Sequence, residues 1–351
     1  MIKTDDKAVE LIVSEAEEIA EAAGLRYVTD TLPGFQRRKN GKGFIYIDKN
    51  GNKVTDEKYL KRFESLVIPP AWTDVWICPG ANGHIQATGR DVKGRKQYRY
   101  HPKWNEISNE TKFSRIVLFG QKLSAIRERI EEDFRKRSLI KEKVLALLVK
   151  LLEETMIRVG NSEYALQNES YGLTTLKTHH LETNGNHIQL VFKGKSGKKW
   201  NVRIRDRRII NAIMKIQELP GQELFQYVDE TGTIQSIDSS DVNNYLREVT
   251  EEDFTAKDFR TWTGTIKMAI ELFKQGRSIS EKESKRKISA AVKQVSRSLI
   301  NTPAICRKYY IHPAILNAYE NGSLIDALSN CNIESQTEVE KTVLNILQKN
   351  I

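Results

Sequence analysis

Residues 174–205 read TTLKTHHLETNGNHIQLVFKGKSGKKWNVRIR, an island of strand-forming sequence inside a mainly helical region. Turn signals at Asn184-Gly185 and at Lys195-Ser-Gly197 divide its β-branched and aromatic residues into three runs. Short runs joined by such turns are typical of antiparallel hairpins. The island therefore predicts a three-stranded antiparallel meander, with strands at residues 174–181, 187–192 and 200–204.

On both sides of this island, apolar residues recur at helical spacing. The preceding helices are indicated by two sets: Leu118, Leu123, Ile126, Ile130 and Phe134, then Val144, Leu147, Leu148, Leu151 and Leu152. Helices are predicted to resume after the island and to continue to about Leu316. We therefore predict a mainly helical domain over residues 106–320. Residues 321–351 are more acidic and polar, and they predict a C-terminal tail with a short helix at 338–347.

Residues 1–105 have a different character. Alanine, glutamate and spaced apolar residues predict a helix at residues 5–23. Strand-like pieces at 44–47 and 76–77 then alternate with Gly, Asn and Pro turn signals, and a helix is indicated at 56–66. These residues predict a small β-rich N-terminal domain, so the predicted fold class of the chain is α+β.

The composition favours a folded protein with a polyanionic partner. The 351 residues include 56 Lys and Arg against 46 Asp and Glu, a formal net charge of +10, and 39% of the residues are hydrophobic. The pI is about 9.3. Nucleic acid is the commonest polyanion that basic proteins bind, although many proteins are basic without binding it.

Cysteine usage and hydropathy indicate a cytoplasmic protein with no membrane partner. Cys78, Cys306 and Cys331 are far apart and lack C-x-x-C spacing, which argues against a disulfide framework and a zinc cluster. The chain starts without the pattern of a signal peptide, and its apolar runs are too short to span a bilayer.

Three cationic residues stand in well-marked places: Arg158 before Gly160-Asn161, Lys195 in a predicted hairpin tip, and Arg260 near the start of a helix. Two guanidinium groups and an ammonium could surround a phosphate and stabilise its transition state. Each residue also has an ordinary interpretation: a charge at a helix end, a solvated basic turn, or a surface ion pair. The sequence around Lys195 lacks the spacing of a nucleotide-binding phosphate loop.

A pair of tyrosines lies downstream, in NTPAICRKYYIHP at residues 301–313. A phenol with a pKa of about 10 attacks a phosphodiester only where cations favour its ionised form. Arg307 and Lys308 precede the pair. Tyrosines in helices are more often packed than reactive, so this segment alone decides nothing.

A further basic and aromatic segment, GRDVKGRKQYRY, lies at residues 89–100. On a strand, Tyr98 and Tyr100 would share one face. Cations bind phosphates, tyrosines pack on sugars or bases, and a glutamine such as Gln97 can contact a base edge. The alternative is an exposed basic loop beside a half-buried strand.

Together these segments resemble a type IB DNA topoisomerase of the small bacterial and poxvirus-like kind, from about Leu25 to about Ala318. The resemblance rests on the order and separation of short motifs: Pro69-Pro-Ala-Trp72, Gly94-Arg-Lys-Gln-Tyr98, Arg158-Val-Gly-Asn161, Tyr171-Gly-Leu-Thr-Thr-Leu176, Phe192-Lys-Gly-Lys195, Lys257-Asp-Phe-Arg-Thr261, Asn301-Thr-Pro303 and Tyr310-Ile-His-Pro313.

The resemblance implies an enzyme that relaxes supercoiled duplex DNA through a 3′-phosphotyrosine, as a monomer and without ATP, metal or other cofactor. It implies Tyr310 as the nucleophile, with Tyr309 as a bystander. It assigns phosphate contacts to Arg158, Lys195, Arg260 and Asn301, where Asn301 replaces the histidine of many family members. The implied DNA-binding residues are Arg95, Lys96, Gln97, Tyr98, Tyr100 and Lys257.

Two other functions remain open from the sequence. A tyrosine recombinase shares the covalent step, but those enzymes usually have histidine where Lys257 stands, and the β-rich N-terminal domain also argues against one. A DNA-binding protein with a degenerate catalytic centre is the other alternative, although all the expected side chains are present.

Overall fold

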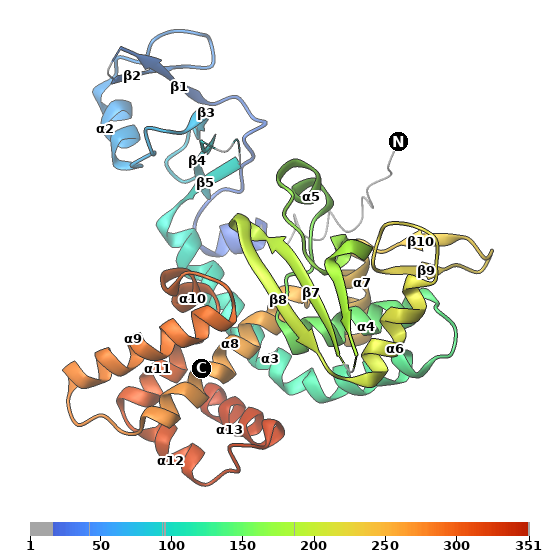
Figure 1. Ribbon diagram of the computed structural model, residues 1–351. Helices are drawn as coiled ribbons and strands as arrows, with labels where there is room; N and C mark the ends of the chain where they lie inside the picture. Colours follow the sequence, from blue (N-terminus) through green and yellow to red (C-terminus); the bar gives the residue numbers. More distant parts are fainter. Residues whose placement is uncertain (1–16, 42, 93, 95, 186, 350–351) are drawn as a thin grey trace. The chain divides into compact units, whose positions relative to one another are not determined.

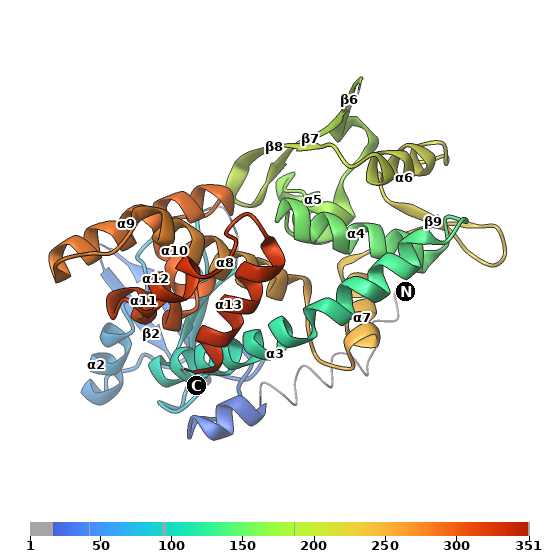
Figure 2. The same cartoon turned by 90° about the horizontal axis from the view of Figure 1, so that it is seen from below.

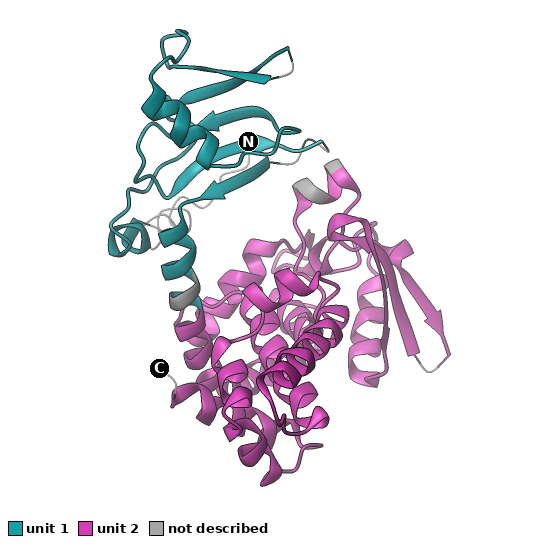
Figure 3. Ribbon diagram, turned by 90° about the vertical axis from the view of Figure 1, so that its left-hand side faces the viewer, with its two compact units in different colours: residues 1–112 teal, residues 113–351 magenta. Residues whose placement is uncertain are grey.

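The computed structural model of this chain describes residues 17–349, except residues 42, 93, 95 and 186. The chain divides into two compact units, residues 1–112 and 113–351 (Figure 3). Unit 1 contains a five-stranded sheet, whereas unit 2 is mainly helical, which confirms the α+β class. The boundary between the units falls within a continuous helix, α3 (Pro102–Arg135), whereas the sequence analysis placed a division after residue 105.

Unit 1 is built on an antiparallel sheet with the strand order β2-β1-β3-β4-β5. Helix α2 (Glu57–Ser65) begins after Asp56, whose side chain accepts a hydrogen bond from the Lys58 N–H. Its Phe63 lies in a core with residues of β3 and β4. The predicted strand at 44–47 and helix at 56–66 are confirmed. The strands are β1 (Phe35–Asn40), β2 (Gly43–Ile47), β3 (Thr73–Ile77), β4 (Ile85–Arg90) and β5 (Lys96–Tyr100).

A helix is also present at residues 17–22, where one was predicted over 5–23; the segment before residue 17 lies outside the described residues. Ala20, Ala23 and Leu25 form a small buried cluster against Tyr27 and Trp104. The described part of the predicted helix therefore covers an aromatic surface of unit 1.

Unit 2 is organised around α4 (Lys141–Thr155), whose residues from Val144 to Leu152 are buried apart from Lys150. A helix that is apolar on nearly all sides belongs in the centre of a core. Helices α7 and α8 pack against it (Figure 1). The other helices that begin in unit 2 are α5 (Ser162–Asn168), α6 (Arg207–Gln217), α7 (Ser239–Thr250), α8 (Ala256–Gln275), α9 (Glu281–Ser298), α10 (Pro303–Tyr309), α11 (Pro313–Glu320), α12 (Ser323–Ser329) and α13 (Gln336–Gln348).

The predicted meander is present as β6 (Leu181–Asn184), β7 (His187–Gly194) and β8 (Lys198–Ile204). Its first strand was predicted too early, at 174–181, because β-branched threonines favour strands. That segment instead forms two 3-10 turns, at Leu173–Thr175 and Thr178–His180. The start of this segment bonds to the chain after α4, since the Thr174 N–H donates to the Val159 carbonyl at 2.7 Å.

Two further predictions differ from the structure. A hairpin of β9 (Gln226–Val228) and β10 (Ile234–Ser236) interrupts the region predicted as helical, around a turn in which Gly232 has a φ of 81°. Residues 321–351 are not a separate tail, because buried side chains of α12 and α13 belong to the core of unit 2. Among the described residues, none of the helices combines the length and hydrophobicity that crossing a membrane requires.

Candidate active site

The site in unit 2 begins at the end of α4, where the chain must leave the core. Met156 caps this helix in the left-handed conformation, with a φ of 58°. The segment that follows carries Arg158 and is held by backbone bonds from Leu173 and Thr174 to the carbonyls of Arg158 and Val159, at 2.9 and 2.7 Å. Arg158 is therefore placed by a segment that lies beyond α5 in the sequence.

Two glycines allow this close approach of the backbones. A Cβ on Gly172 would lie 2.5 Å from the Gly160 Cα and 2.6 Å from the Arg158 carbonyl oxygen. Gly160 has a φ of 114°, which favours glycine. The motifs that contain Arg158 and Tyr171 are thus two halves of one packed structure.

Lys195 lies at the tip of the β7–β8 hairpin, in a short 3-10 turn with Ser196 at a φ of 65°. Two residue pairs before this tip, the hairpin is fixed by the stacked rings of Phe192 and Trp200, whose centroids are 5.9 Å apart. The Tyr171 N–H donates to the Lys193 carbonyl at 2.9 Å. These contacts connect the hairpin to the same segment that supports Arg158.

Arg260 projects from the first turns of α8 and is 3% exposed. Its Nη1 donates to the carbonyl of Met156, and its Nη2 donates to the carbonyl of Leu299 at 2.8 Å. The Arg260 guanidinium lies 5.2 Å from the centroid of the Tyr310 ring. One turn along α8, a Cβ on Gly264 would lie 2.4 Å from the Tyr310 carbonyl oxygen. Arg260 and Gly264 together provide the surface against which Tyr310 packs.

Asn301 contacts the site through Arg158. Arg158 Nη2 donates to Asn301 Oδ1 at 3.0 Å. The Asn301 Nδ2 is buried and has no hydrogen-bond partner among the described residues. The Nε of Arg260 is also buried and without a hydrogen-bond partner among those residues. Buried donors are almost always hydrogen-bonded, so these two donors beside Arg158 and Tyr310 are consistent with a bound acceptor such as a phosphate.

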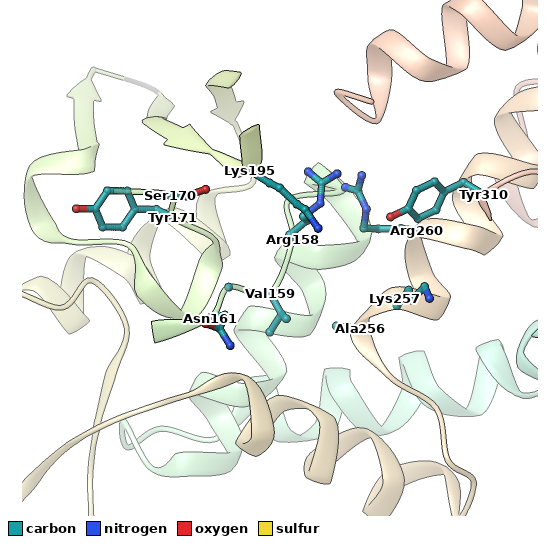
Figure 4. Close-up of a pocket in the computed structure, with 11 residues that line it drawn as sticks. Arg158, Val159, Asn161, Ser170, Tyr171, Lys195, Ala256, Lys257, Arg260 and Tyr310 are labelled. Carbon is teal, nitrogen blue, oxygen red and sulfur yellow. The ribbon is translucent and has the colours of Figure 1, made fainter. Parts of the chain in front are cut away.

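Arg158, Lys195, Arg260 and Tyr310 line one cavity of about 280 Å³ (Figure 4). In Figure 4 the two guanidinium groups are at its centre, and the Tyr310 hydroxyl points toward them. Lys257, predicted from the sequence to contact DNA, lines the same cavity. The structure therefore brings together residues that lie up to about 150 positions apart in the sequence.

The electrostatics of the cavity favour an ionised phenol. Burial raises the pKa of Tyr310, but the charges of Arg260 and Arg158 outweigh it, so the pKa lies below its ordinary value. Burial and the neighbouring Arg158 lower the pKa of Arg260 to about 10, which still leaves it charged at neutral pH. Among the described residues, no group of three or more His, Cys, Asp or Glu side chains is arranged to hold a metal ion.

The described residues of unit 1 that were predicted to bind DNA, Lys96, Gln97, Tyr98 and Tyr100, lie on the edge strand β5. As predicted, Tyr98 and Tyr100 share a face; they are 43% and 39% exposed, and their ring centroids are 5.8 Å apart. Lys96 lies on the same face, with its Nζ 5.7 Å from the centre of the Tyr98 ring. Gln97 is on the opposite face and donates to Asp91 at 3.1 Å. Arg95 lies outside the described residues.

Comparison with known proteins identifies the family. A model of the eukaryotic DNA topoisomerase I catalytic core matches residues 101–336, and a model of the bacterial DNA topoisomerase IB N-terminal domain matches residues 43–91. The chain belongs to the type IB DNA topoisomerases. It is thus a type I topoisomerase, and the family resemblance noted in the sequence is confirmed.

Viral relatives of this topoisomerase match most of its length. The DNA topoisomerase 1B of Acanthamoeba polyphaga mimivirus is 35% identical over 297 residues, which cover 83% of this chain and 88% of the relative. The DNA topoisomerase 1B of Vaccinia virus (strain Copenhagen) is 26% identical over 306 residues, or 83% and 91% of the two chains. A solved XerH site-specific recombinase complex aligns over 60% of this chain and 51% of its own, with 16% identity and a TM-score of 0.34.

Sequence reasoning missed several residues that shape the topoisomerase site. Asn161, Ser170 and Tyr171 line the cavity, while Gly172 and Gly264 hold its backbone elements close together. Asn161, Tyr171 and Gly172 stand inside motifs that carried the family resemblance. Gly264 stands inside the regular apolar spacing of α8. A glycine at such a position was the one sign of close packing that the sequence offered.

Proposed function

We propose that this topoisomerase relaxes duplex DNA through a covalent bond between Tyr310 and the 3′ side of a broken strand. The proposal depends mainly on one observation. In a single cavity, the Tyr310 hydroxyl points toward the guanidinium groups of Arg260 and Arg158, and Lys195 from the β7–β8 hairpin lines the same cavity. That arrangement suits attack on a phosphodiester, because cations stabilise both the phenolate and the extra charge of a five-coordinate phosphorus.

In the proposed cleavage step, Tyr310 releases its proton to solvent, and the resulting phenolate oxygen forms a bond to phosphorus while the bond from phosphorus to the 5′ oxygen breaks. Arg158, Arg260 and Asn301 donate to the nonbridging oxygens, and Lys195 donates a proton to the departing 5′ oxygen. The products are a 3′-phosphotyrosine and a 5′-hydroxyl. Attack by that hydroxyl reverses the step and reseals the strand after the DNA has rotated.

The chemistry as written consumes no nucleotide, because the energy of the broken bond is kept in the phosphotyrosine. The charge that a metal ion would supply in other phosphoryl transfers is here assigned to Arg158, Arg260 and Lys195. All of the proposed catalytic side chains come from one chain, which supports action as a monomer. DNA as the substrate and unpaired cysteines support a cytoplasmic location, with bacterial nucleoid DNA as the proposed target.

The purified protein should relax supercoiled plasmid DNA in buffer that contains EDTA and no ATP. Addition of detergent during the reaction should trap nicked plasmid joined to protein, because denaturation prevents resealing. Gel electrophoresis of the relaxed products and of the trapped complex measures both results. A requirement for ATP or for a divalent metal would contradict the proposed chemistry.

Unit 1 is proposed to bind DNA through the face of β5 that carries Lys96, Tyr98 and Tyr100. Replacing Lys96 by glutamine should weaken binding to all DNA sequences alike and lower the slope of log affinity against log salt by about one. Titrations at several salt concentrations measure this slope. Lys61→Gln is the matched control, since Lys61 is exposed on α2 and pairs with Glu57 at 3.5 Å. Equal effects of the two substitutions would contradict the assigned face.

A further inference from the structure

Arg127, on α3, joins three helices of unit 2 through its guanidinium group. Nη1 and Nη2 donate to the two carboxylate oxygens of Glu340 on α13, at 2.7 and 2.8 Å. Nε donates to the carboxylate of Glu153 on α4 at 2.8 Å. Gln336, one turn earlier on α13, donates to Glu340 at 2.9 Å. None of these residues has a part in the cleavage step described above.

The burial of Glu340 and its bidentate bonding to Arg127 make the cluster sensitive to substitution of either residue. The Glu340 side chain is only 9% exposed, and its two bonds to Arg127 form a bidentate pair. Burial raises the pKa of Glu340, but the hydrogen bonds from Arg127 and Gln336 outweigh this effect and keep it below the usual value. Loss of Arg127 would leave the buried Glu340 carboxylate bonded to the neutral Gln336 amide, without its charged donor.

The cluster connects directly to the segment that carries Arg158. Glu153 lies in the last turn of α4, and the next residues include Met156, whose carbonyl accepts a hydrogen bond from Arg260. Arg158 follows two residues later. A shift of the α4 end would therefore move both proposed phosphate-binding arginines.

Helix α13 also reaches α8 by packing, and the two lie side by side in Figure 2. A Cβ on Gly120 of α3 would be 2.4 Å from the Trp262 ring and 3.2 Å from a methyl group of Leu344 on α13. Trp262 is two residues beyond Arg260. Helix α13 therefore packs against α8 close to Trp262, near Arg260. Through Arg127 it is also linked to the end of α4.

We propose that α13 positions the active-site arginines, with the Glu340–Arg127–Glu153 cluster as the link to Arg158 and Arg260. Glu340 and Arg127 act as positioning residues, because neither lines the cavity that contains Tyr310. The inference rests on the catalytic roles proposed for the two arginines. It concerns an element that begins at residue 336, where the match to the family catalytic core ends.

Glu340→Gln tests this inference, because glutamine keeps the shape but presents an amide N–H to Arg127. The single-turnover cleavage rate at saturating DNA should fall roughly tenfold, since small misplacements of catalytic groups are costly. The dissociation constant for DNA should stay unchanged. Glu252→Gln is the control: it breaks a 2.8 Å ion pair with Lys122, also on α3, and the wild-type cleavage rate is expected.

Rates should be compared at a temperature at which circular dichroism shows every variant to be folded. If Glu340→Gln does not fold, Gln336→Ala is the milder test, with a smaller loss of rate in the same direction. A wild-type cleavage rate in a folded Glu340 variant, or an equal loss in Glu252→Gln, would overturn the positioning role. Absence of cleavage in the wild-type protein would instead reject the proposed function itself.

Discussion

Tyr310→Phe should abolish DNA cleavage and plasmid relaxation while DNA binding remains close to that of the wild type. Phenylalanine keeps the ring that packs against Arg260 and Gly264 but lacks the oxygen that attacks phosphorus. Removal of the nucleophile eliminates the formation of the covalent bond to phosphorus, so activity should fall by several orders of magnitude. In well-studied hydrolases, the corresponding loss is on the order of 10⁶. Detergent trapping of the covalent complex measures the loss directly.

Tyr309→Phe is the matched control, because the two tyrosines are adjacent and half-buried. Tyr310 lines the cavity, whereas the Tyr309 ring lies 5.2 Å from the Lys308 ammonium. The control should cleave DNA at nearly the wild-type rate. A covalent complex formed by Tyr310→Phe, or lost in Tyr309→Phe, would show that the nucleophile has been misassigned.

Local patterns in the sequence predicted those parts of the fold that depend on neighbouring residues. The alternation and turns around Asn184 and Lys195 predicted the β7 and β8 strands, and the apolar spacing before Thr155 predicted α4. The strand predicted at 174–181 was wrong because its threonines are buried by contacts with the segment after α4. Strand propensity carries no information about such distant contacts.

The same limit applies to the candidate site. Residue types and motifs singled out Arg158, Lys195, Arg260 and Tyr310, but periodicity alone could not show that they line one cavity. Their convergence depends on backbone contacts such as that between Gly172 and Gly160, and on packing of Tyr310 against Gly264. That the Asn301 amide nitrogen lacks a partner among the described residues while its oxygen accepts a hydrogen bond from Arg158 became visible only in the structure.

The C-terminal residues illustrate a different limit. Residues 321–351 are polar enough overall to suggest a tail, yet Val339, Val343 and Leu347 place a narrow apolar stripe on one side of α13. Such a stripe is sufficient to bury a helix when a complementary surface exists. That surface comes from α8 and α11, which the sequence of the last residues cannot reveal.

Arg260→Gln should slow cleavage by about two to three orders of magnitude, the usual loss when one transition-state donor is removed. A second effect on pH dependence is expected. The charge of Arg260 lowers the pKa of Tyr310, so its removal should raise that pKa. A smaller fraction of the phenol would then be ionised at a given pH, and the residual activity should be shifted to more alkaline pH than in the wild type.

Single-turnover cleavage rates measured from neutral to alkaline pH separate these two effects. Arg260→Lys should also be slow, because an ammonium cannot replace the planar guanidinium that bonds to Met156 and Leu299. Its pH profile should nevertheless stay closer to that of the wild type, since the positive charge beside Tyr310 is retained. Arg208→Gln, which removes an exposed arginine that pairs with Glu131 on α3, is the control and should change neither property.

The outcomes distinguish the roles of Arg260 because the charge and the hydrogen-bond geometry are changed separately. If Arg260→Gln lowers the rate equally at every pH, Arg260 stabilises the transition state without acting on the phenol. If both Arg260 variants cleave DNA at the wild-type rate, the guanidinium that touches the Tyr310 ring has no catalytic function. A large loss in Arg260→Gln with an alkaline shift, and a smaller shift in Arg260→Lys, would support both parts of the proposal.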